Sequence, residues 1–133
     1  MKITAIRGIM LRCTCSHISD ALSTSTARQA LLVKIETDAG LYGIGEAFTY
    51  GAPLKIMKYL VEEQLGPMLI GQDPTEIEKH WNTMYWRTIA HGRRSMTMGA
   101  MSGIDIALWD LLGKAAHMPV CKLLGQHLDR VPS

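Results

Sequence analysis

Two aspartates five residues apart are the first side chains in this sequence that could act as an acid–base pair or share a metal ion. Asp105 and Asp110 both lie in a stretch with helical spacing of apolar residues. Because each helical residue turns by about 100°, a separation of five residues points the two carboxylates in different directions. We therefore predict that they form hydrogen bonds or ion pairs that hold a buried helix against a neighbouring element.

The cysteines offer little for catalysis or metal binding. Cys13 and Cys15 are one residue apart on an expected strand, where alternation places both side chains on one face. With Cys121 they make an odd, small set, which is typical of reduced thiols and not of a disulfide framework. We interpret the pair as packing residues, with a metal site as the weaker alternative. No two histidines have the spacing of a metal site.

A short basic segment, His91-Gly92-Arg93-Arg94, comes just before the last long helical pattern. We interpret it as the solvent-exposed start of that helix. The alternative is that it anchors an anionic substrate or a neighbouring subunit. His80 and His91 are predicted at the surface or at a helix end. His117 falls in the last turn of its helix, where a positive charge is favourable.

The composition is that of one domain with a hydrophobic core. The 133 residues are 47% hydrophobic and 20% charged, with a net charge of +2. That charge is too small to indicate a nucleic acid or a membrane surface as partner. No apolar run approaches the roughly 20 residues of a membrane span, and residues 1–4 do not resemble the start of a signal peptide. We therefore expect a cytoplasmic protein.

The elements that must position these residues begin with three strands. Residues 2–12, 28–37 and 41–47 have the β-branched content or the period-2 alternation of strands. Asp38-Ala39-Gly40 predicts a tight connection between the second and third strands, because glycine accepts a positive φ readily. The Ser- and Thr-rich stretch at 16–26 is predicted to be a long loop.

Three helices are expected after the strands. The first begins at Pro53 and ends at Gly66-Pro67. The second begins at Asp73-Pro74 with the aspartate as its cap, and the third runs from near Ser95 to about His117. In the third helix three small residues recur every four positions and would allow another element to approach closely; they are Gly99, Gly103 and Ala107. The fold class is therefore α+β, a three-stranded antiparallel meander followed by a helical bundle.

The order of these elements and several local strings resemble the mandelate racemase and muconate lactonizing enzyme family of the enolase superfamily. The resemblance rests on Val33 to Gly40, Gly43-Ile44-Gly45-Glu46-Ala47, Asp73-Pro74, Ser102 to Lys114, and Pro119-Val120 with Leu123-Leu124-Gly125. It extends over the whole chain, in order. It implies an N-terminal domain that caps a TIM-type (β/α)7β barrel, which is absent from this chain.

The resemblance implies Mg²⁺ chemistry located outside this chain. In the family, carboxylates on barrel strands hold Mg²⁺, and the enzyme removes the proton next to a substrate carboxylate. Residues 1–133 would form the capping domain, with about 118–133 leading into the missing barrel. No catalytic residue or metal ligand is therefore assigned here, and this fragment alone is expected to be inactive.

Two loops fold over the pocket in that family and help to select the substrate. By position they correspond to His17–Thr26 and Phe48–Pro53. The resemblance implies substrate contacts from the residues of these loops that can bond or wall off a polar substrate, namely His17, Ser19, Thr24, Phe48, Thr49 and Tyr50. The alternative is that each is an ordinary solvated residue. Glu46, at the end of the hairpin, is interpreted as structural and not catalytic.

Within the family, the polar first loop favours a sugar acid as substrate and hence an acid-sugar dehydratase. A racemase or a cycloisomerase is the alternative. The expected partners are a small carboxylate substrate and, for the full-length enzyme, further copies of itself. If the chain is complete as given, a non-catalytic binding or assembly module takes precedence. Nine methionines and three tryptophans indicate apolar surface that a partner covers.

Overall fold

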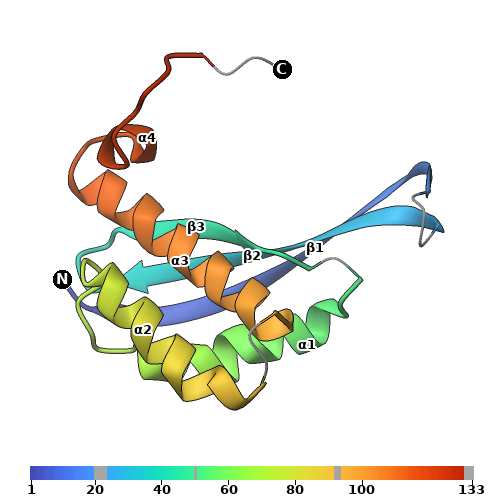
Figure 1. Cartoon of the computed structure of the whole chain (residues 1–133), viewed down its shortest axis with the longest axis horizontal. Coiled ribbons are helices and arrows are strands. Elements are labelled where there is room, and N and C mark those ends of the chain that lie inside the picture. The colour runs from blue at the N-terminus through green and yellow to red at the C-terminus, as the bar shows by residue number, and fades with distance from the viewer. Residues whose placement is uncertain (20–23, 50, 92–93, 131–133) are drawn as a thin grey trace.

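A three-stranded antiparallel sheet with helices over one face forms the body of the molecule (Figure 1). The computed structural model describes residues 1–19, 24–49, 51–91 and 94–130. The strands are neighbours in chain order: β1 (Ile3–Ser19), β2 (Thr24–Thr37) and β3 (Tyr42–Ala47). The predicted α+β class and the meander are confirmed.

The central strand carries the alternation that the sequence predicted. Leu31, Val33 and Ile35 are fully buried beneath the helices, whereas the residues between them face the other side and are half-buried. Gly40 has a φ of +75° in the connection to β3, which is the left-handed conformation expected of that glycine. The core therefore lies between one face of the sheet and the helical layer.

The first two strands are longer than predicted and form a hairpin arm, which we define as residues 13–19 and 24–28. Cα pairing continues from Cys13–Arg28 to Ser19–Thr24, with a register shift between Thr14 and Ile18. The prediction of a loop at 16–26 was therefore wrong for most of its length. The arm extends beyond the helices (Figure 1). Without a buried face, its residues have no reason to alternate in hydrophobicity, which removes the usual signal of a strand.

The first predicted helix changes its hydrogen bonding along its length. It comprises α1 (Leu54–Tyr59), a π-helical segment (Leu60–Leu65) and a 3-10 turn (Gly66–Met68). Helical backbone thus continues through the Gly66-Pro67 pair instead of ending there. The next elements are α2 (Ile77–Thr88) with a 3-10 turn (Ile89–His91), then α3 (Met96–Ala115) and α4 (Val120–Leu123). The third helix begins near Ser95 as predicted, and the Ser95 side chain caps it by accepting a 3.3 Å bond from the Thr97 N–H.

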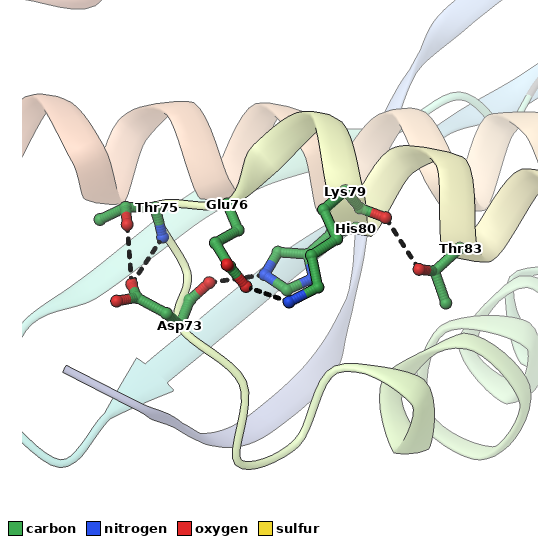
Figure 2. Close-up of polar contacts among 6 residues, drawn as sticks. All are labelled: Asp73, Thr75, Glu76, Lys79, His80 and Thr83. Carbon is green, nitrogen blue, oxygen red and sulfur yellow. Dashed lines mark hydrogen bonds and ion pairs between the residues drawn. The ribbon is translucent and has the colours of Figure 1, made fainter.

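The predicted cap at the start of α2 was wrong. Asp73 does not cap the helix: its carboxylate accepts bonds from the backbone N–H and the hydroxyl of Thr75, at 3.0 and 2.8 Å, which also lowers the pKa of that carboxyl. The helix then begins at Ile77. His80 was predicted at the surface or at a helix end; it lies in the first turn of α2 but is only 2% exposed. Its Nε2–H donates to the Asp73 carbonyl at 2.6 Å and fixes this turn against α2 (Figure 2).

Glycines allow the backbones of β3 and α3 to touch. A Cβ added to Gly43 would lie 2.0 Å from the Ala107 carbonyl oxygen, and one added to Gly45 would lie 2.1 Å from the Gly103 carbonyl oxygen. A Cβ on Gly103 would in turn meet Ala47 at 2.9 Å. The predicted groove of small residues is therefore occupied by β3.

Polar side chains complete this contact at the free edge of β3. The Asp110 carboxylate accepts the Ile44 N–H at 2.7 Å and the Lys114 ammonium at 2.7 Å. Lys114 also donates to the Tyr42 carbonyl at 2.9 Å, and its ammonium lies 4.5 Å from the centre of the Tyr42 ring. Backbone groups that would otherwise be open to another strand are thus satisfied by α3.

We expect Gly45→Ala to destabilise the protein by about 3 kcal/mol, because the added methyl group must displace backbone atoms of α3 and cannot be absorbed by a flexible side chain. Ser102→Ala, at an exposed position next to Gly103, is the control and should change stability by less than about 0.5 kcal/mol. Urea unfolding monitored by circular dichroism measures both. Equal stability of the two variants would contradict the close backbone contact.

Candidate functional site

The two groups of candidate residues lie at the same end of the sheet. Both β1 and β3 run antiparallel to β2, so their C-terminal ends point the same way (Figure 1). The groups differ in how far they extend. Ala47 pairs with Leu31, and β2 continues for seven residues from Leu31 back to Thr24, which is a rise of about 23 Å. The arm therefore reaches well beyond the end of β3.

The arm holds three of the candidates on paired strands. His17 lies in the register shift between Thr14 and Ile18, and Ser19 and Thr24 are Cα partners at the last pair before the tip. All three side chains are exposed. An extended two-stranded arm holds polar groups at a defined distance from the body, which an irregular loop of the same length would not do.

The second group follows β3 directly. Phe48 is 70% exposed, and the Thr49 carbonyl accepts the Ala52 N–H at 2.8 Å in a turn. Tyr50 lies outside the described residues. The position of Phe48 depends on Gly99 of α3, where an added Cβ would lie 2.5 Å from the Phe48 carbonyl oxygen. The same small-residue stripe that holds β3 thus also holds this segment.

Phe48 forms one wall of a hollow at the start of α3. The hollow has a volume of about 450 Å³, and its lining combines apolar, hydroxyl and cationic groups: Phe48, Ala52, Arg94, Ser95, Met96, Met98, Gly99 and Ser102. The guanidinium of Arg94 is well suited to a carboxylate, which it can bind through two parallel N–H donors. The site therefore has the chemistry to hold a small anion beside an aromatic wall.

Sequence reasoning found only part of this hollow. Arg94 belongs to the basic segment for which substrate anchoring was one interpretation, whereas Met98 and Ser102 were not named. Gly92 and Arg93 of the same segment lie outside the described residues. The sequence did hold one signal for this hollow. Gly99 and Ser102 are three residues apart, which places both on the same face of α3 near its first turn.

Glu46 lies apart from this hollow. It pairs with Leu32 on the sheet face away from the helices and is exposed. A different, shallow hollow brings it together with Arg12 and Arg28 of the neighbouring strands. By strand register Arg28 is on the same outer face of the sheet as Glu46, and we retain the structural interpretation of Glu46.

The two aspartates of α3, Asp105 and Asp110, have different surroundings. Asp110 bonds the edge of β3, as predicted for a residue that fixes the helix against a neighbour. Asp105 is half-buried. Burial raises the pKa of its carboxyl above the ordinary value of 3.8, and the negative charge of Glu78 on α2 raises it further.

Cys13 and Cys121 are exposed and Cys15 is half-buried, all as free thiols. The packing interpretation of the Cys13 and Cys15 pair was wrong for Cys13, because the arm has no second layer over either face. Across the described residues, no group of three or more His, Cys, Asp or Glu side chains is placed to hold a metal ion. Nor does any described helix have the length and apolar character to cross a membrane.

Comparison with known proteins decides the family. Residues 7–125 match the N-terminal domain of mandelate racemase and muconate lactonizing enzymes. This chain belongs to that family. It is 41% identical over 129 residues to the D-mannonate dehydratase of Novosphingobium aromaticivorans, a match that covers 94% of this chain and 27% of that enzyme.

Solved structures of the family have the same fold. An enolase-superfamily member from Polaromonas sp. JS666 superposes with a TM-score of 0.91 at 35% identity, covering 100% of this chain and 35% of that one. The L-talarate dehydratase from Polaromonas sp. JS666, solved with Mg and L-glucarate, has a TM-score of 0.85 at 31% identity, covering 98% and 36%. The chain thus spans about a third or less of the length of these relatives.

The raised pKa of Asp105 predicts how stability depends on pH. The folded protein binds this proton more tightly than the unfolded chain, so stability falls as the pH rises from 3.8 through the folded pKa. We expect Asp105→Asn to be more stable than the wild type at pH 7, with the difference disappearing below pH 3.8. Chemical denaturation at several pH values measures this. Glu63→Gln, at an exposed position, controls for loss of one charge, and a less stable Asp105→Asn at pH 7 would refute the prediction.

Proposed function

We propose that this chain forms the substrate-covering part of an acid-sugar dehydratase. The observation that carries the proposal is the hollow at the start of α3, where Arg94 and Phe48 meet at the end of the sheet from which the hairpin arm extends. An acid sugar has a carboxylate and several hydroxyl groups. The hollow offers a guanidinium for the first and hydroxyl side chains for the second.

Two of the relatives reported above support the choice of a dehydratase within the family. The relatives reported above include a D-mannonate dehydratase and an L-talarate dehydratase, the latter solved with L-glucarate. Their named substrates are sugar acids. Dehydration of such a substrate begins with removal of the proton next to the carboxylate and ends with loss of a hydroxyl group as water, so it needs a site closed to solvent.

In this proposal the described residues bind and enclose the substrate. Arg94 pairs with its carboxylate, Phe48 excludes water from one side, and Ser102 bonds a hydroxyl group. The arm brings His17, Ser19 and Thr24 over the substrate from further out. Each of these roles is positional, and none moves a proton.

Magnesium would stabilise the charge that develops on the substrate carboxylate. The described residues do not fit this ion, since they bring no three acidic or imidazole ligands together. Mg was present in the L-talarate dehydratase structure. We place its ligands and the proton-transferring groups in the remainder of the enzyme, so no step of the reaction is assigned to this chain.

We expect Arg94→Ala to lower kcat/KM for the preferred acid sugar by about tenfold to hundredfold, mainly through a higher KM, since it removes a charged binding contact. The complete enzyme is assayed with Mg²⁺ and a panel of acid sugars. Lys55→Ala, which removes an exposed cation on α1, is the control and should have no effect. Equal activity of Arg94→Ala and Lys55→Ala would exclude the hollow as the binding site.

A variant with a shortened arm tests whether the arm is needed for activity and not for folding. Residues 14–27 are replaced by Asn-Gly, which suits a two-residue hairpin turn between the paired residues Cys13 and Arg28. Because the arm contributes nothing to the hydrophobic core, we expect the melting temperature to change by only a few degrees, while kcat/KM falls at least tenfold. Calorimetry and the same assay measure the two effects. Full activity of a folded, shortened enzyme would show that the arm does not cover the substrate.

A further inference from the structure

Two separate segments of the chain form the walls of the hollow at the start of α3. One wall contains Phe48 and Ala52 and leads directly into α1. The other contains Arg94 and the first turns of α3. A substrate that contacts both walls requires a fixed distance between them, so the contacts that join the walls determine how well the hollow binds.

Apolar packing joins α1 to α3 beside the hollow. Met57 of α1 is fully buried, and a Cβ added to Gly99 of α3 would lie 3.4 Å from its terminal methyl carbon. The same Cβ would lie 2.5 Å from the Phe48 carbonyl oxygen. This packing fixes the helix itself, whereas Arg94 precedes the helix. The segment that carries Arg94 therefore needs a contact of its own.

A hydrogen bond between two side chains supplies a contact at that segment. The side-chain amide nitrogen of Gln64 lies 2.9 Å from Nδ1 of His91. Gln64 belongs to the π-helical segment that continues α1, and His91 ends the 3-10 turn after α2. Because an amide nitrogen can only donate, Nδ1 of His91 is the acceptor. The bond thus ties the continuation of α1 to the connection between α2 and α3.

His91 is bonded at the same time to the residue that caps α3. The Ser95 hydroxyl donates to the His91 carbonyl at 3.5 Å, and its oxygen accepts the Thr97 N–H at 3.3 Å. The chain from His91 to Ser95 therefore begins and ends at anchored residues. Arg94 lies immediately before the second of them, so its backbone position depends on both anchors.

The helix that carries Gln64 is suited to this task. π-Helical turns are uncommon in proteins and occur frequently at functional sites. In this one, Val61 and Leu65 are fully buried and hold the segment to the core, while Gln64 is half-buried and His91 is exposed. A firmly held amide thus fixes the position of a surface residue that would otherwise depend on its own turn alone.

We propose that Gln64 and His91 are positioning residues that hold Arg94 at the correct distance from Phe48, an inference that rests on the binding role proposed above for Arg94. Neither is among the described residues that line the hollow. They therefore act on the substrate through Arg94 and not by touching it.

Loss of the bond would affect binding more than folding. Without it, the connection between α2 and α3 is free to shift relative to α1, while the buried packing of Met57 against Gly99 stays in place. A guanidinium binds a carboxylate through two parallel N–H donors, so a small displacement of Arg94 weakens both bonds together. The chemical step takes place elsewhere in the enzyme and would proceed at its usual rate once the substrate is bound.

Removal of either partner tests the proposal in the complete enzyme, assayed with Mg²⁺ and its preferred acid sugar. We expect His91→Ala and Gln64→Ala each to raise KM about threefold to tenfold, the effect of one net hydrogen bond, with kcat changed less than about twofold. His91→Asn should keep the wild-type KM, because its carbonyl oxygen is attached to Cγ as Nδ1 is and can accept the same bond. Glu63→Ala, at the exposed position next to Gln64, is the matched control and should leave KM unchanged.

Combination with Arg94→Ala separates this inference from the proposed function. In the Arg94→Ala background, His91→Ala should raise KM no further, because the residue that it positions is gone. An equal rise of KM in both backgrounds, a wild-type KM for His91→Ala and Gln64→Ala, or a His91→Asn variant as weak as His91→Ala would overturn the positioning role and leave that of Arg94 intact. An Arg94→Ala enzyme with the wild-type KM would instead overturn the proposed function and this inference with it. Circular dichroism confirms folding; if His91→Ala fails to fold, Gln64→Ala replaces it in both comparisons.

Discussion

The contact on which the rest of this structure depends is the approach of β3 to α3 without intervening side chains. Gly43 and Gly45 on the strand face Ala107 and Gly103 on the helix, and an added methyl group at either strand position would overlap the helix backbone. Such contacts fix the distance and the rotation of the helix together, because a glycine interface has no side chains that can repack. The position of α3 on the sheet is therefore set by main-chain atoms.

The contact between β3 and α3 also fixes the positions of both ends of α3. Towards the N-terminus, Gly99 admits the carbonyl of Phe48, which brings the segment after β3 over the first turn of the helix and forms the hollow with Arg94. Towards the C-terminus, Asp110 and Lys114 reach the backbone of β3 and close its free edge. The hollow and the protected sheet edge thus follow from one run of small residues.

The sequence predicted those features that a buried face imposes. The alternation in β2 and the small residues of α3 both reflect contact with the core, and both predictions were correct. The arm was missed because neither of its faces is buried. The burial of His80 was missed because it depends on the turn at Asp73, whose carbonyl it binds. Arg94 could be recognised as a basic residue but not assigned to a hollow, since Phe48 reaches it only through the fold.

The position of the apolar residues determines which parts of this domain are constrained by the core. One face of the sheet is used for the core, so the arm projects without a second layer and depends on paired backbone alone for its shape. An arm of this kind can vary in sequence at little cost to stability, which suits the role in substrate selection that we propose for it.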